Sequence, residues 1–162
     1  MKKIIAFLLA LALSCSMLTA VCSASSERED IFIQISGAEG ISKDHAHCKW
    51  IDGVDYKLNC AADGTVTGIT FIHLVDPATT KIIEYYMNGV YFYEAKLNIC
   101  QYFAGKQYTV LDVCMKHVFV SSTKVIVLDD GSVAETVTLT SDQITVTEMP
   151  LVIGQDGQPI YG

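Results

Sequence analysis

Short runs in which apolar and polar residues alternate make up most of the chain after residue 30. Successive side chains of a β-strand point to opposite faces, so this period of two indicates strands with one buried face. The runs are also rich in Val, Ile, Thr and Tyr, which favour strands. We expect strands over Ile31–Ile35, Tyr56–Ala61, Val66–Val75, Lys81–Met87, Tyr108–Val113, Val118–Val120, Val125–Leu128, Ser132–Leu139 and Ile144–Met149, and a returning strand that starts at Val90.

Turn residues separate these runs at close spacing. Asn88-Gly89 is the strongest hairpin signal, because both residues accept the positive φ that a two-residue turn requires. Asp63-Gly64 and Asp129-Asp130-Gly131 mark further turns. We therefore predict an all-β domain, an antiparallel sandwich or barrel-like meander of about eight or nine short strands.

One segment, Glu94–Ala104, fits two structures. Its apolar residues alternate with Glu94, Lys96 and Asn98, which indicates a strand. The segment also contains good helix formers and is followed by Gly105, which could cap a helix. We expect a strand, because it continues the predicted Asn88-Gly89 hairpin, and a helix on one face of the sheet is the alternative.

The N-terminus has the layout of a secretory signal peptide. A basic start is followed by the apolar run Ile4–Leu13 and by small residues that favour cleavage after Ala24. The predicted organisation is a signal peptide (1–24), a flexible leader (25–30), a β domain (31–153) and an irregular tail (154–162). We do not expect a lipid anchor at Cys22, because Thr19 and Val21 do not fit a lipobox. No later apolar run reaches the ~18 residues of a membrane helix, and we predict a secreted or extracytoplasmic bacterial protein.

Four cysteines follow the predicted cleavage site: Cys48, Cys60, Cys100 and Cys114. An even number in an exported chain predicts two disulfide bonds that staple the domain. We favour the local pairs Cys48–Cys60 and Cys100–Cys114, while the other two connectivities remain open. Each bond would contribute ~3 kcal/mol on the chain-entropy model.

The charge of the chain excludes one large class of partners. The formal net charge is −7 in 162 residues, and cleavage would remove Lys2 and Lys3 and make it more negative. Arg28 is the only arginine. Binding to nucleic acid requires clustered Lys and Arg to displace phosphate counterions, so we expect no nucleic-acid partner. Anionic lipid surfaces are disfavoured for the same reason.

Two histidines form the strongest candidate metal site. On a strand, His45 and His47 would point to the same face, as a zinc or copper site requires. His73 or His117 would supply a third ligand. The alternative is a pair of surface histidines beside a structural cysteine.

Aromatic residues gather around the predicted Asn88-Gly89 hairpin. In a two-residue turn, Tyr85 and Phe92 face each other and share the more exposed face with Met87. These three residues are the candidate binding surface, because aromatic side chains on a rigid hairpin stack on sugars or anchor a protein partner. The alternative is that aromatic pairs across the strands only stabilise the sheet.

No motif for catalysis is present. The chain lacks the Gly-x-Ser-x-Gly, His-Glu-x-x-His and phosphate-binding glycine patterns, and we expect neither an enzyme nor a cofactor. The favoured function is an exported, non-catalytic binding domain that acts on a protein or glycan at or outside the cell surface. The alternatives are an extracytoplasmic Cu/Zn-binding protein, a small secreted hydrolase, or an assembly subunit that exposes an open sheet edge.

Overall fold

The computed structural model describes residues 29–154 and 159–160. The predicted signal peptide and most of the predicted leader lie outside these residues. Glu29 and Asp30, which we assigned to the leader, already belong to the first strand. No helix in the described ranges is long and apolar enough to cross a membrane.

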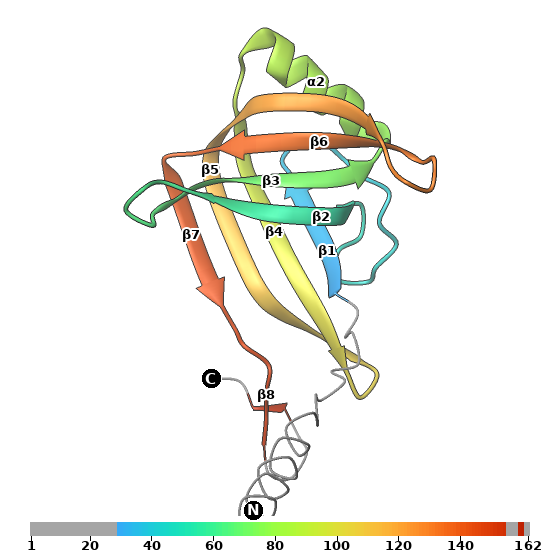
Figure 1. The fold of residues 1–162 in the computed structure, drawn as a ribbon, viewed down its shortest axis with the longest axis vertical. Helices are drawn as coiled ribbons and strands as arrows, with labels where there is room; N and C mark the ends of the chain where they lie inside the picture. Colours follow the sequence, from blue (N-terminus) through green and yellow to red (C-terminus); the bar gives the residue numbers. More distant parts are fainter. Residues whose placement is uncertain (1–28, 155–158, 161–162) are drawn as a thin grey trace, which may run out of the picture.

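Over the described residues, the fold is an antiparallel sheet that curls into a barrel, accompanied by one helix (Figure 1). Seven strands are hydrogen-bonded in the order β4-β1-β2-β3-β6-β5-β7. An additional pairing of β4 with β5 closes the strands from β4 to β5 into the barrel. The antiparallel all-β prediction is therefore confirmed, apart from the helix. The elements are β1 (Glu29–Ile35), β2 (Ile51–Cys60), β3 (Val66–Leu74), α2 (Pro77–Asn88), β4 (Phe92–Phe103), β5 (Lys106–Val127), β6 (Val133–Thr140), β7 (Gln143–Glu148), β8 (Val152–Ile153) and β9 (Pro159–Ile160).

Strand β5 connects the two parts of the barrel. Its first half pairs with β4 on one side and β7 on the other, and its second half pairs with β6. Figure 1 shows the bend between the halves, which coincides with a positive φ of 50° at His117 and a register shift between Val120 and Ser122. We predicted three separate strands here; one continuous, bent strand of 22 residues replaces them.

Helix α2 corrects the prediction of a strand over Lys81–Met87 and a hairpin at Asn88-Gly89. Asp76 caps the helix, because its carboxylate accepts from the Ala78 N–H at 2.9 Å. Pro77 occupies the first turn, where its missing N–H costs nothing. Gly89, at φ 61°, ends the helix by donating its N–H to the Tyr86 carbonyl. Positive φ at Gly89 alone thus ends a helix here, and Asn88-Gly89 does not form a hairpin turn.

The strand expected over Glu94–Ala104 is confirmed. Strand β4 runs from Phe92 to Phe103, and Ala104-Gly105 forms the turn into β5 with positive φ at both residues. Strand β4 lies between β1 and β5. Ala95, Leu97 and Ile99, which alternate with polar residues in the sequence, are buried in the structure.

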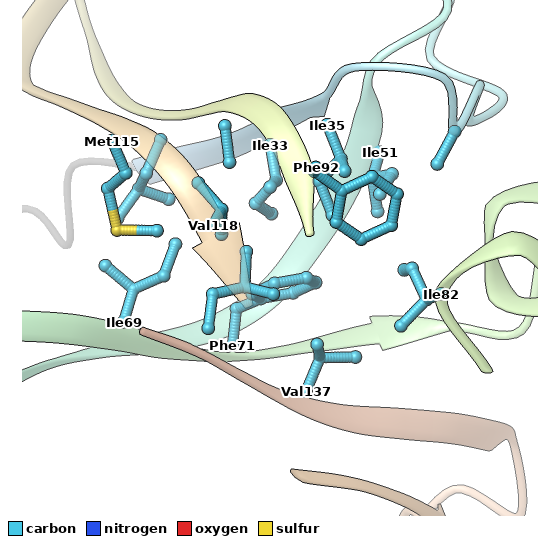
Figure 2. Close-up of a cluster of buried hydrophobic side chains, with 14 of the residues drawn as sticks. Ile33, Ile35, Ile51, Ile69, Phe71, Ile82, Phe92, Met115, Val118 and Val137 are labelled. Atoms are coloured by element: carbon cyan, nitrogen blue, oxygen red, sulfur yellow. The ribbon is translucent and has the colours of Figure 1, made fainter. Parts of the chain in front are cut away.

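The hydrophobic core fills the space between the strands and α2 (Figure 2). Phe71 lies near the middle of the labelled cluster and is fully buried. Ala78 and Ile82 lie one helical turn apart on the inner face of α2, and both are buried in this cluster. The cluster of buried side chains drawn in Figure 2 includes Ile33, Ile35, Ile51, Ile69, Phe71, Ile82, Phe92, Met115, Val118 and Val137.

A buried polar network joins the first turn of α2 to the sheet. His73 Nε2 lies 3.0 Å from Glu135 Oε2, and Thr123 donates a hydrogen bond to the other oxygen of Glu135. His73 Nδ1 lies 3.7 Å from Asp76 Oδ1, too far for a hydrogen bond. Burial raises the pKa of Asp76, although the His73 charge and the helix N–H groups oppose this rise.

The raised pKa of Asp76 predicts how stability depends on pH. The folded protein holds this proton more tightly than the unfolded chain, so the contribution of Asp76 to stability is largest in acid and falls as pH rises through its pKa. Asp76→Asn keeps a good cap without the charge. The free energy of unfolding of Asp76→Asn, relative to the unmodified protein, should therefore rise between about pH 3 and about pH 7 in urea titrations.

Asp63→Asn is the matched control for this prediction. The backbone N–H of Thr65 donates to Asp63 and lowers its pKa. A lowered pKa contributes stability that is present at neutral pH and lost in acid, so the relative stability of this variant should fall over the same range. A pH-independent difference for Asp76→Asn contradicts the prediction.

Candidate functional site

Four neighbouring strands present one outer face with few charges. Strands β2, β3, β6 and the second half of β5 lie side by side (Figure 1). Thr70 on β3 pairs with Thr138 on β6, and their hydroxyl oxygens are 3.1 Å apart. Along the two middle strands, β3 and β6, residues that face the core alternate with residues that face outward. All of the outward residues are uncharged. By this alternation they are Gly68, Thr70, Ile72, Leu74, Ala134, Thr136, Thr138 and Thr140, of which Gly68 and Ala134 are buried.

Among the described residues, neither outer strand of this four-stranded sheet has a strand partner along its free edge, although helix α2 lies beside β5. Strand β1 pairs with β2 only at Ile51–Gly53, so Val54–Cys60 pairs with β3 alone. The β4–β5 ladder ends at Val118, so Phe119–Val127 pairs with β6 alone. No other strand in the described part of the chain pairs with these two stretches. An open edge offers unpaired N–H and C=O groups to another chain.

The start of the β2 edge and the β5 edge carry opposite charges, while Lys57 is exposed further along β2. Asp52 and Asp55 are exposed at the start of β2, and Lys124 is exposed on β5. Within residues 29–154 none of these three side chains takes part in an ion pair. The edges are therefore electrostatically complementary to each other rather than to a neighbour within the same chain.

A small pocket lies beside the β2 edge. It has a volume of about 230 Å³ and is lined by Ile41, Asp52, Gly53, Val54, Leu74 and Asp76. The side chains of Ile41, Val54 and Leu74 are 56%, 48% and 45% exposed, although all three are apolar. Apolar side chains left in water next to an open edge are typical of a contact surface.

The predicted metal ligands His45 and His47 do not lie on a strand. They belong to the turn that precedes β2, where His45 is exposed and His47 is buried. In the described residues no group of three or more His, Cys, Asp and Glu side chains is arranged to hold a metal ion. His73 pairs with Glu135, and His117 lies on β5 beside Tyr91 and Gln143. Metal binding by His45 and His47 stays a prediction.

His47 instead anchors the connection between β1 and β2. Its ring stacks on Phe32 with a centroid distance of 4.0 Å. Its Nδ1 lies 2.7 Å from Asp44 and its Nε2 lies 3.2 Å from the side-chain oxygen of Asn98 on β4. Burial acts to raise the pKa of Asp44, but hydrogen bonds from His47 and Ala46 outweigh it and lower that pKa. This network fixes the connection between β1 and β2, which also contains Ile41.

The predicted aromatic binding surface is divided in the structure. Tyr85 and Phe92 do stack, with centroids 4.0 Å apart, but the stack joins α2 to β4 and Phe92 is buried in the core. Met87 is 75% exposed at the end of α2. The hairpin register that placed the three on one face does not exist, and ligand binding by these residues stays a prediction.

The predicted disulfide bonds are absent: Cys48, Cys60, Cys100 and Cys114 are all free. Cys100 pairs with Thr109 while Cys114 pairs with Lys96, so the backbone positions of the two cysteines lie about 13 Å apart along the ladder. Cys60 is the last residue of β2 and Cys48 precedes the first, so the ten residues of the strand, which span about 30 Å, separate the two cysteines. Both separations exceed the ~7 Å limit for a disulfide. Burial also raises the pKa of the Cys100 thiol.

Together these features define a class: a barrel of antiparallel strands with one helix, whose sheet is left open at two complementary edges. The model of the family described as the type VI secretion system effector Hcp matches residues 32–147. The chain belongs to this family. The prediction of a secreted or extracytoplasmic location is thereby confirmed.

Solved structures of the same family share the fold. Hcp1 from Salmonella typhimurium is 22% identical, with a TM-score of 0.68 over 82% of this chain and 91% of that one. A type VI secretion system effector from Yersinia pestis is 19% identical, with a TM-score of 0.64 over 82% and 97%. The secreted protein Hcp3 from Pseudomonas aeruginosa is 12% identical, with a TM-score of 0.64 over 83% and 97%. A search of curated proteins finds no match.

The residues at the open edges were missed in the sequence. Ser122, Lys124 and Ile126 alternate with Thr123, Val125 and Val127, which indicates a strand. The pattern does not show which other strands lie beside this one. Asp52 and Asp55 flank the Gly53-Val54 step at the start of β2 and look like ordinary turn residues. The only signal was the general possibility of an assembly subunit with an open edge.

Proposed function

We propose that this chain is a structural subunit of a type VI secretion tube, in which copies join into hexameric rings and the rings stack around a channel for effectors. The role needs no catalytic residue. It refines the secreted, non-catalytic protein expected from the sequence and replaces a surface-binding domain as the favoured function.

The observation that supports this proposal best is the pair of open edges on one four-stranded sheet. A head-to-tail contact between two different surfaces of a protein repeats from copy to copy and forms a ring when the rotation closes. Joining the β5 edge of each copy to the β2 edge of the next would continue the sheet and leave no open edge. The outer face of β3 and β6 would then line a channel with uncharged, mostly small side chains.

The test is the mass and shape of the purified protein from Ser25 to Gly162, the chain expected after cleavage. Light scattering after size exclusion should give about six times the monomer mass, and negative-stain electron microscopy should show rings. A protein that stays monomeric up to its solubility limit contradicts the proposal. Addition of a reducing agent should not change the result, because the described cysteines are free.

A further inference from the structure

We propose that Lys124 of one copy binds the carboxylates of Asp52 and Asp55 of the next copy, while Phe119–Val127 of the first adds as a strand to Val54–Cys60 of the second. The partner is thus a second copy of this chain. This inference rests on the proposed ring and names the surface and the charged residues that would form it.

The directions of the strands allow this pairing. Each of the pairs β2–β3, β3–β6 and β6–β5 is antiparallel, so β5 runs opposite to β2 at the two edges of the sheet. A ring axis roughly along the strands preserves these directions from copy to copy. The β5 edge of one copy then meets the β2 edge of the next in the same antiparallel sense as every pair within the sheet.

The charges favour this contact. Asp55, Ile72, Thr136 and Lys124 follow one another across the four strands, so Asp55 and Lys124 stand at the same level on opposite edges and on the same face. Asp52 lies three residues before Asp55 on β2. If the strands tilt relative to the ring axis and shift the neighbouring copy along them, Asp52 can replace Asp55 as the carboxylate partner of Lys124. The same level places Lys57 opposite Ser122 rather than opposite Lys124. Opposite charges across strands attract and like charges repel.

Apolar side chains beside these charges match as well. Val125 and Val127 on the β5 edge are 55% and 70% exposed. The pocket beside the β2 edge exposes Ile41, Val54 and Leu74. Val125 and Val127 lie on the face of β5 opposite Lys124, so joining the edges would remove their apolar surface from water on one face of the sheet while the charged pair meets on the other.

The test is a change of charge at Lys124. Lys124→Glu should abolish the ring and leave a folded monomer by light scattering, with an unchanged far-UV circular dichroism spectrum. Lys106→Glu is the matched control, because Lys106 is equally charged and exposed but lies at the first residue of β5, where it pairs with Phe103 and is away from both edges. It should form rings as the unmodified protein does. Rings of Lys124→Glu equal in amount to those of the unmodified protein overturn the inference.

Restoring the charge pair in reverse makes the test specific. Lys124→Glu combined with Asp55→Lys, or with Asp52→Lys, recreates an opposite pair between copies, and at least one combination should recover the ring. Recovery by neither overturns the inference, because Lys124 then acts through some other contact. If the unmodified protein itself forms no ring, the proposed function fails instead, so the two failures are distinguishable.

Discussion

Replacing Glu135 by Ala is expected to lower the free energy of unfolding by about 3–5 kcal/mol. The side chain is fully buried on β6 and is the direct cross-strand partner of His73 on β3. Its loss would leave His73 without a hydrogen bond at either ring nitrogen, because Nδ1 already has none, and would also orphan the Thr123 hydroxyl. A buried group left unpaired costs its full desolvation penalty.

Urea unfolding at neutral pH measures this effect. The experiment uses the Lys124→Glu background throughout, so that assembly does not add to the apparent stability. Glu148→Ala is the control, because Glu148 is an exposed glutamate on a strand, and it should change stability by at most about 0.5 kcal/mol.

A double substitution separates pairing from burial. Replacing both His73 and Glu135 by Leu removes the two polar groups together, and replacing a buried pair by apolar residues is often neutral. The double variant should therefore lose much less stability than the summed losses of the single variants His73→Leu and Glu135→Leu. Additive losses would show that the two side chains contribute independently, contrary to the network.

The strands were largely predictable because their burial has a period of two. Apolar residues of β1, β3, β4 and β6 alternate along the chain and face the core as expected. The helix was not predictable from the same signal, since Ile82, Ile83, Tyr85 and Tyr86 fit a strand as well as one face of a helix. Asp76-Pro77 was the missed clue, because an acidic N-cap followed by proline starts a helix.

The candidate site could not be read from the sequence because it is a property of topology. Lys124 and Asp55 are almost seventy residues apart, and only the strand order places them at opposite edges of one sheet. The disulfide prediction failed for a related reason. An even number of cysteines says nothing about register, and the register of β4 and β5 separates Cys100 from Cys114.

The other large effect is expected from Phe71→Ala, which should lower the free energy of unfolding by about 3–5 kcal/mol. Phe71 has no exposed surface and lies on β3, which pairs with β2 and β6 on either side. Figure 2 shows its ring within the cluster that includes Ile82 of the helix and Val137 of β6. Removing the ring leaves a cavity that the rigid sheet cannot fill, because neighbours on three elements would have to move together.

Phe119→Ala is the matched control for this prediction, since it makes the same substitution on β5 at a ring that is 46% exposed. Its loss of stability should be less than half that of Phe71→Ala, because half of the ring already contacts water. The comparison uses urea unfolding in the Lys124→Glu background, with the slope of each transition checked for two-state behaviour. Equal losses for the two variants would mean that Phe71 does not organise the core. A large loss at Phe71 alone would show that the four strands bearing the open edges depend on the core beneath them, so edges and core are one structural unit.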